Sequence, residues 1–308
     1  YVAIGTREAA EPEPEARPGA GGSLHVPMAG VVTSLDPAAT ETLEQSDLVP
    51  LVFETLTRDA GGAAVVPWLA ADFLPEEGGR RYRFRLRDGA RFSDGRRLTA
   101  RDVRYSFERL LRSGGDSRFL FAPIRGARAL LAGETSDLSG FRIHSASELT
   151  IDLEEPVAFF PALMSYPSVA IVPEGADPSV AGTWVGTGPF RVASFEPGRR
   201  LVLEPNRSYW RKGYPRSEGL TFSFGVPPGD MLTGFRAGRY ALASDLFPAD
   251  VEALRHEPRF MAGYRESPRL LTYFAVFNTR QGALADRALR QRLVGAVDVP
   301  RAVRQHLG

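Results

Sequence analysis

Hydrophobic and charged side chains alternate strictly in one stretch of the chain. Tyr82, Phe84 and Leu86 are separated by single arginines between residues 81 and 87. Successive side chains of a strand point to opposite faces of its sheet, so this period of two predicts a half-buried strand. The Asp88–Gly89 pair that follows is a hairpin signal, and it predicts that the chain returns through residues 91–92.

A helix is predicted directly after this region, beyond a second turn at Asp94–Gly95. Thr99 lies three residues before Asp102, as in a capping box in which aspartate replaces the usual glutamate or glutamine. The hydrophobic residues that follow have helical spacing and form one stripe: Val103, Phe107, Leu110 and Leu111. Residues 91–111 are therefore expected to serve as scaffold, with their apolar side chains in a core.

The rest of the chain alternates between the two-residue period of strands and the spacing of helices. Further strands are predicted at residues 24–27, 148–155, on either side of Pro197–Gly198, at 220–226 and, as a buried strand, at 269–278. Helices are predicted near residues 47–56 with Asp47 in the first turn, at 157–165, from a capping Asp230 to Gly238, at 248–258, and from Asp286 onward. Such alternation favours an α/β architecture.

The N-terminal segment has a different composition. Residues 7–22 alternate proline, glutamate, alanine and glycine without apolar periodicity, which predicts a disordered tether over residues 1–22. The chain opens on Tyr1 rather than methionine, which indicates a processed or trimmed end. A tether of this kind is expected after an export signal or membrane anchor, and an inter-domain linker has the same composition. The sequence contains no run of 18 apolar residues.

Composition and charge narrow the possible functions. The 308 residues are 43% hydrophobic and 24% charged with a net charge of +1, so there is no global field for nucleic acid. Lys212 is the only lysine among 38 Lys and Arg residues, which makes any single arginine run weak evidence of function. The arginines of residues 81–87 are consistent with a phosphate grip, but a solvated strand face is the favoured interpretation.

Motifs for catalysis and cofactors are missing. There is no cysteine, no P-loop, no dinucleotide fingerprint, no nucleophile elbow, and no two histidines within five residues of each other. The acidic pairs Glu76–Glu77 and Glu154–Glu155 adjoin loop signals and are interpreted as solvated turns. We therefore expect no enzyme, no metal site and no cofactor, although a triad assembled from distant residues stays open.

Several segments, taken together and in order, resemble the family 5 solute-binding proteins of ABC importers, which include oligopeptide-, dipeptide- and nickel-binding proteins. The matching phrases are SLDPA, LVFETLTRD with VPWLAADF, YRFRLRDGARFSDGRRLTARDVRYSFERL, GTGPFRVASFEPGRRLVLEPNRSYW, FRAGRYAL and FNTRQGALADRALRQRL. The resemblance implies a class II periplasmic-binding-protein-like fold, with two α/β lobes around a cleft. It places lobe I at residues 23–50 and 184–263, an inserted subdomain at 51–183, and the incomplete start of lobe II at 264–308, so the chain is expected to be a fragment or a shortened protein.

The resemblance also implies where a ligand binds. In the resembling peptide binders, ligand contacts come from four places. In this chain they correspond to Glu41, Thr42 and Leu43 after the SLDP turn, and to Phe119 after the capped helix. They also correspond to Ser244 and Asp245 at a hinge-side strand end, and to Tyr273 and Phe274 in the strand that crosses to lobe II. Extended backbone would pair with peptide amides, aromatic rings would cover side chains, and a carboxylate would meet an amine. Phe119 and Phe274 are equally compatible with core positions, and Asp245 with a cap for the turn before Pro248.

The function implied is that of a monomeric, exported binding protein that captures a peptide or similar small solute and delivers it to a membrane permease, with no nucleic-acid partner. The location expected is periplasmic or extracytoplasmic, with the tether as a possible anchor. The alternative is a solute-sensing regulatory domain of the same fold, fused to an anchor or signalling domain. The ligand itself is not predicted, because the second lobe would supply much of its pocket.

Overall fold

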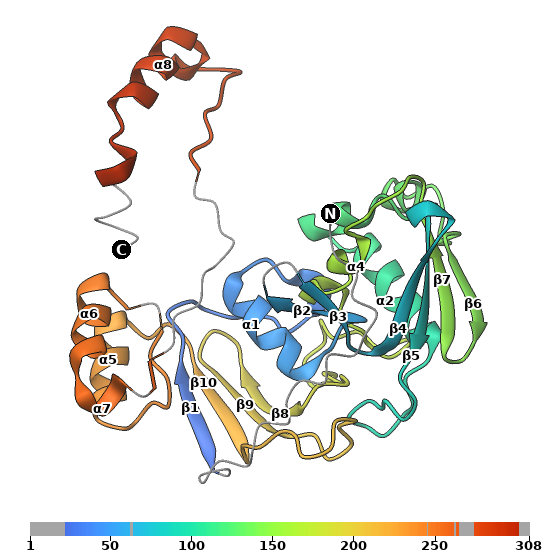
Figure 1. The fold of residues 1–308 in the computed structure, drawn as a ribbon, viewed down its shortest axis with the longest axis horizontal. Helices are drawn as coiled ribbons and strands as arrows, with labels where there is room; N and C mark the ends of the chain where they lie inside the picture. Colours follow the sequence, from blue (N-terminus) through green and yellow to red (C-terminus); the bar gives the residue numbers. More distant parts are fainter. Residues whose placement is uncertain (1–21, 62–63, 245, 262, 265–273, 302–308) are drawn as a thin grey trace.

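A computed structural model describes residues 22–61, 64–244, 246–261, 263–264 and 274–301 (Figure 1). Two four-stranded sheets dominate it, with helices around them. The strands are β1 (Ser23–Pro27), β2 (Thr57–Gly61), β3 (Ala64–Pro67), β4 (Ala70–Glu76), β5 (Arg81–Leu86), β6 (Phe141–Ser145), β7 (Glu148–Asp152), β8 (Phe190–Glu196), β9 (Arg200–Pro205) and β10 (Gly219–Ser223). The α-helices are α1 (Leu43–Val52), α2 (Ala100–Arg112), α3 (Ala127–Leu131), α4 (Phe160–Leu163), α5 (Pro228–Arg236), α6 (Pro248–His256), α7 (Pro258–Met261) and α8 (Arg287–Ala296).

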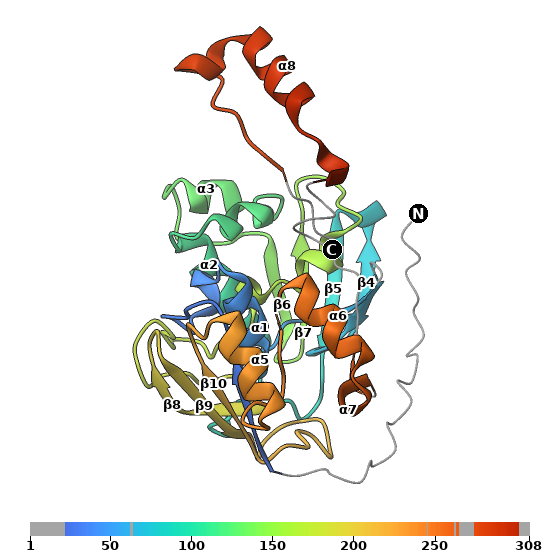
Figure 2. The same cartoon turned by 90° about the vertical axis from the view of Figure 1, so that its left-hand side faces the viewer.

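The first sheet, here the β1 sheet, has the order β1-β10-β9-β8. β1 runs parallel to β10, and the other pairs are antiparallel. Side chains of α1 pack on this sheet, where Val52 and Phe53 share a buried cluster with Leu201, Leu203 and Phe222. In Figure 1, α5, α6 and α7 gather beside β1, while α8 lies well away from both sheets in Figures 1 and 2.

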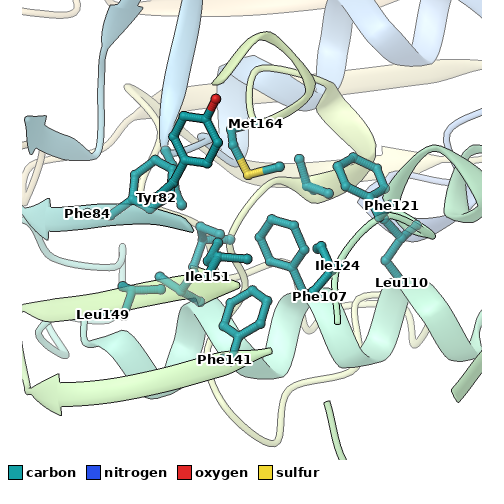
Figure 3. Close-up of a cluster of buried hydrophobic side chains, with 14 of the residues drawn as sticks. Tyr82, Phe84, Phe107, Leu110, Phe121, Ile124, Phe141, Leu149, Ile151 and Met164 are labelled. Atoms are coloured by element: carbon teal, nitrogen blue, oxygen red, sulfur yellow. The ribbon is translucent and has the colours of Figure 1, made fainter. Parts of the chain in front are cut away.

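The second sheet, here the β5 sheet, is antiparallel throughout, with the order β4-β5-β7-β6. Helix α2 covers one face of it, and the predicted stripe is fully buried there, with Val103, Phe107, Leu110 and Leu111 all at 0% exposure. Figure 3 shows Phe107 among aromatic and aliphatic side chains from β5, β6, β7 and the segment after α2. The predicted strand at residues 82–86 and the predicted helix after Thr99 are both confirmed.

Local signals placed other elements correctly as well. The strands around Pro197–Gly198 are β8 and β9, Gly238 follows α5 with a φ of 74°, and Asp286 caps α8 by accepting a hydrogen bond from the Ala288 N–H. Two strands and two helices thus begin or end where turn and cap residues predicted them. The two sheets and their helices confirm the α/β class, and the assignment of residues to lobes stays a prediction.

The hairpin predicted at Asp88–Gly89 is wrong. The antiparallel neighbours of β5 are β4 and β7, and Arg91 forms only an isolated bridge with Arg97. The turn itself is present, but the Arg87 N–H donates to the Leu69 carbonyl, which leads the chain away from β5. Both edges of β5 are already occupied by strands from elsewhere in the sequence, so a returning strand has no place.

Two helix starts also differ from the prediction. α1 begins at Leu43 rather than near Asp47, because Thr42 and Gln45 form a capping box four residues earlier and Pro50 is accommodated inside the helix. α5 begins at Pro228 after Pro227, so Asp230 lies in the first turn and does not cap. In both cases a stronger start signal lies upstream of the acid that the sequence singled out.

The arginines of β5 form a ladder of ion pairs on the solvent side of the β5 sheet. Arg81 pairs with Asp152 and Glu77, Arg83 with Glu76 and Glu148, and Arg85 with Asp72. Since neighbouring strands supply a carboxylate to each guanidinium, the ladder is a structural feature of the sheet. The favoured interpretation, a solvated strand face, is confirmed. Glu76 is the last residue of β4 and Glu77 opens the turn that leads to β5.

Asp152 is the buried centre of this ladder, with its side chain 1% exposed and pairs to Arg81, Arg142 and Arg125. Burial alone would raise the pKa of Asp152, but the Arg81 hydrogen bond and the nearby positive charges together hold it below its usual value. A lowered pKa in the folded state means that the stabilisation is present above the unfolded pKa and is lost as the pH falls through the folded one.

We therefore expect Asp152→Asn to lower the melting temperature at pH 7, with a gap from wild type that narrows below about pH 4, near the pKa of an unfolded aspartate. Thermal melts followed by circular dichroism across this range measure the gap. A gap that stays constant down to the lowest pH would contradict the role assigned to the ion pairs.

The N-terminus of α2 supports a second prediction. The Thr99 N–H and hydroxyl both donate to Asp102 Oδ2 at 2.7 Å. Thr99→Ala is expected to cost about 1 kcal/mol of unfolding free energy, which is typical of a lost cap, and to leave ligand affinity unchanged. Urea unfolding and a binding titration test the two halves separately, and a loss of affinity without loss of stability would place Thr99 in a binding site.

Candidate ligand-binding site

The segment after the SLDP turn is held by an ion pair that reaches across from α2. Asp36 caps the short 3-10 helix Pro37–Ala39 by accepting from the Ala38 N–H. Both of its carboxylate oxygens accept hydrogen bonds from Arg109, at 2.5 and 2.6 Å, and Arg109 also binds Asp177. This two-point contact fixes the turn against α2 and so positions the residues that follow it.

Glu41, Thr42 and Leu43 come next and are all exposed, Leu43 to 62%. Thr42 caps α1, and the Gln45 side-chain oxygen accepts from the N–H groups of Glu41 and Thr42 at 3.0 and 3.1 Å. The N–H groups of these two residues are therefore already used. Any main-chain pairing between a ligand and Glu41 must use its carbonyl oxygen, which narrows the prediction that extended backbone here binds peptide amides.

The loop after α2 lies directly against this segment. A side chain at Gly115 would place its Cβ 3.1 Å from the Ala38 carbonyl oxygen and 4.0 Å from Glu41 Oε1, so the close approach favours glycine. The same loop leads into the 3-10 helix Asp116–Phe121, in which Phe119 is 54% exposed. The structure thus brings Glu41 and the Phe119 helix to one place. We call residues 40–43 and 113–119 the Glu41 rim.

The Arg118 side chain stacks on the Phe119 ring. The Arg118 guanidinium carbon lies 4.9 Å from the centre of that ring, and Arg118 also donates a hydrogen bond to the Ser113 carbonyl. Stacking of this kind holds an exposed aromatic ring in place at little further entropic cost on binding. An exposed, oriented aromatic ring in the same rim as the Glu41 carboxylate is suited to contact a ligand with both apolar and charged parts.

The Glu41 rim also contains polar atoms without a hydrogen-bond partner. Within the described residues, four buried polar atoms of the Glu41 rim have no hydrogen-bond partner: Thr40 Oγ1, Ser113 Oγ, Ser117 Oγ and Arg118 Nε. Buried polar groups are nearly always paired in folded proteins, so a cluster of unpaired ones calls for water or a ligand. The rim therefore combines a ring, a carboxylate, a guanidinium and unpaired polar atoms within a short stretch of surface.

The other predicted site residues are less well placed. Ser244 is partly buried and lies three residues after Ala241, whose N–H donates to the His25 carbonyl in β1. Asp245 and Tyr273 lie outside the described residues. Phe274 is described, but it is 79% exposed in an irregular segment, so the buried strand predicted over residues 269–278 is wrong for residues 274–278. None of the eight assignments is tested by these positions, and all stay predictions.

Comparison with known proteins places the chain in a family. The model of bacterial extracellular solute-binding proteins, family 5 Middle, matches residues 64–308. The chain belongs to this family. The resemblance inferred from the ordered sequence phrases is thereby confirmed.

Individual relatives agree with the family 5 assignment. The periplasmic murein peptide-binding protein MppA of Escherichia coli is 29% identical over 282 residues, which are 86% of this chain and 51% of MppA. The periplasmic oligopeptide-binding protein OppA of Salmonella typhimurium is 27% identical over 288 residues, 87% of this chain and 51% of OppA. The family 5 chain thus spans about half the length of these curated relatives.

The fold agrees with a solved structure of the family. The murein tripeptide binding protein MppA of Escherichia coli superposes with a TM-score of 0.81 and 25% identity, covering 92% of this chain and 57% of that one. The periplasmic-binding-protein-like fold inferred from the sequence is confirmed.

Two residues of the candidate site region were not found from the sequence. Arg118 escaped notice because arginine is so common here that a single one carries no signal, although its position next to Phe119 would have been the clue. Arg109 was placed on α2, but its contact with Asp36 spans 73 residues and has no local signature. In the described part of the chain, no cluster of histidine, aspartate and glutamate has the geometry for a metal ion, and no helix is long and apolar enough to cross a membrane.

Proposed function

We propose that the protein is a non-enzymatic binding component of an ABC importer that captures a peptide or similar small solute and delivers it to a membrane permease. The observation that carries the proposal is the Glu41 rim, which contains an exposed ring stacked by Arg118, the Glu41 carboxylate and four buried polar atoms without a hydrogen-bond partner among the described residues. Family membership supports the same function, since relatives carry the names murein peptide-binding and oligopeptide-binding protein.

The mechanism proposed is closure of two lobes on the ligand, with the Glu41 rim contributing from one side. Phe119 would cover an apolar part of the ligand, Glu41 would meet an amine, and Arg118 with the nearby hydroxyls would bind polar groups. The free energy of closure would come from burying the ligand between the lobes. An extracytoplasmic location and a monomeric state belong to this proposal.

Phe119→Ala tests the rim directly. The protein is purified at the length its gene encodes, a pool of synthetic tri- to pentapeptides is screened, and the tightest binder is titrated by calorimetry. Losing a buried aromatic contact of roughly 2 kcal/mol corresponds to a loss in affinity of about thirtyfold. The matched control is Phe159→Ala, since Phe159 is 59% exposed, outside the rim, and precedes α4.

Equal affinities for wild type, Phe119→Ala and Phe159→Ala would remove the rim from the ligand site while leaving peptide binding in place. If the rim binds the ligand, only Phe119→Ala loses peptide affinity. The melting temperatures of all three proteins should then lie within a few degrees of one another.

A further inference from the structure

A second place in the molecule has the features of a binding site. The described residues line an open pocket of about 720 Å³, within the range of roughly 300–1,000 Å³ that is usual for small-molecule sites. No residue of the Glu41 rim lines it. Its apolar walls come from β1, the end of α1, the start of β8 and the segment before Val169, and they include Leu24, Pro50, Phe53, Pro167, Pro189 and Phe190.

A buried carboxylate organises the polar side of this pocket. Glu54, 4% exposed, accepts hydrogen bonds from Trp68 Nε1 at 2.8 Å, from the Tyr209 hydroxyl at 2.9 Å and from Trp210 Nε1 at 3.0 Å. Burial, together with the Glu54 charge, raises the pKa of Tyr209, which keeps its hydroxyl protonated as a donor. Glu54 is thus fully engaged in holding aromatic side chains at fixed positions, and its role is to build the wall.

Arginines lie on two aromatic rings of the pocket, one of which, Trp68, is bound by Glu54. The guanidinium carbon of Arg58 lies 4.5 Å from the centre of the Trp68 ring, and that of Arg211 lies 5.5 Å from the same ring and 4.3 Å from the Tyr214 ring. A guanidinium stacked on a ring keeps its N–H edge directed outward and loses little freedom when it binds. The pocket therefore presents an oriented positive edge beside an apolar wall.

Arg58 is the residue of the pocket that points most clearly to a ligand, because its charge has no partner in the described structure. Across the described residues, its guanidinium makes no hydrogen bond and no ion pair, in contrast to the arginines of β5, each of which meets a carboxylate. The two acids that line the pocket form no ion pair with Arg58 in the described structure. Glu54 accepts hydrogen bonds from three other donors, and Asp59 Oδ1 accepts from the Gly61 N–H. Arg58 therefore adds to the pocket lining a cation that no described carboxylate pairs with, which favours an anion.

We propose that this pocket, here the Glu54 pocket, binds a small planar carboxylate. The carboxylate would lie against the N–H edge of Arg58, and the flat body would pack on the apolar wall. Arg–carboxylate hydrogen bonds are among the strongest that proteins form, and an apolar wall of proline and phenylalanine suits a flat hydrocarbon body. The site is separate from the Glu41 rim and does not depend on peptide binding there.

Calorimetric titration of the purified protein with benzoate, indole-3-carboxylate and indole-3-acetate tests the proposal, with indole-3-carboxamide as the neutral counterpart. At least one carboxylate should bind saturably, and the carboxamide should bind about tenfold more weakly or not at all. Arg58→Gln should weaken carboxylate binding by about tenfold or more, as expected for a lost charge-assisted hydrogen bond. Arg58 is exposed, so this variant is expected to fold normally, and a melting curve checks that.

Arg199→Gln is the matched control, because Arg199 is 80% exposed, pairs only with the nearby Glu196 in the described structure, and lies outside the pocket. It should bind the carboxylates as wild type does, and so should Phe119→Ala. Absence of saturable binding for all three carboxylates would overturn the proposal. So would a carboxylate affinity that is the same in wild type and Arg58→Gln.

Discussion

Replacing Glu54 by alanine should lower the free energy of unfolding by about 4 kcal/mol. The change removes the acceptor of Trp68, Tyr209 and Trp210 at once, and each buried donor left without a partner costs about 1–3 kcal/mol. The loss exceeds that of an ordinary surface carboxylate because Glu54 is only 4% exposed. Equilibrium unfolding in urea measures it, and a loss below about 1 kcal/mol would contradict the role of Glu54 as the centre of this cluster.

Glu54→Gln is the matched variant, because it keeps the shape and one oxygen acceptor but turns an N–H₂ group toward a donor. A loss of about 2 kcal/mol is expected for this single mismatch. Burial raises the pKa of Glu54 despite the hydrogen bonds that oppose it. The folded protein therefore holds this proton more tightly than the unfolded chain, so the advantage of wild type over Glu54→Gln should shrink as the pH rises above about 4.3.

Phe107→Ala is expected to have an effect of similar size, about 4 kcal/mol, through a different mechanism. Phe107 is 0% exposed and contacts the rings of Phe121 and Phe141, with centres 5.6 and 5.1 Å away (Figure 3). Truncation leaves a cavity between α2 and the β5 sheet that surrounding side chains fill only in part.

Phe159→Ala, at a ring that is 59% exposed, is the control and should change the unfolding free energy by less than about 0.5 kcal/mol. Urea unfolding compares the two variants under the same conditions. Equal losses at the two positions would show that the buried stripe of α2 does not form the core assigned to it.

The sequence predicted elements well where the deciding signal was local. The stripe of α2 and the alternation of β5 each depend on residues within one turn or one strand, and both formed as expected. The hairpin after Asp88–Gly89 failed because the edges of β5 were taken by β4 and β7, a competition that no local pattern reveals. The predicted start of α1 near Asp47 was wrong because the Thr42–Gln45 capping box is a stronger start signal than a single acid.

The candidate site shows the same limit. Glu41 and Phe119 were suggested by family resemblance, and their proximity depends on Gly115 packing against Ala38, which is a long-range contact. The Glu54 pocket was not anticipated at all, since its aromatic donors lie 14 to 156 residues from Glu54 in the sequence. Contacts between charges and rings that are far apart in the sequence produce no local pattern from which they could be predicted.

The central claim is that the protein binds a peptide or similar small solute at a site that includes the Glu41 rim. Native mass spectrometry of the protein, purified without added ligand and then mixed with a pool of tri- to pentapeptides, tests it most directly. We predict a one-to-one complex with a peptide or a co-purified small solute, reduced in Phe119→Ala and unchanged in Phe159→Ala. Protein that stays free of any solute, both as purified and in the presence of the peptide pool, would contradict the claim.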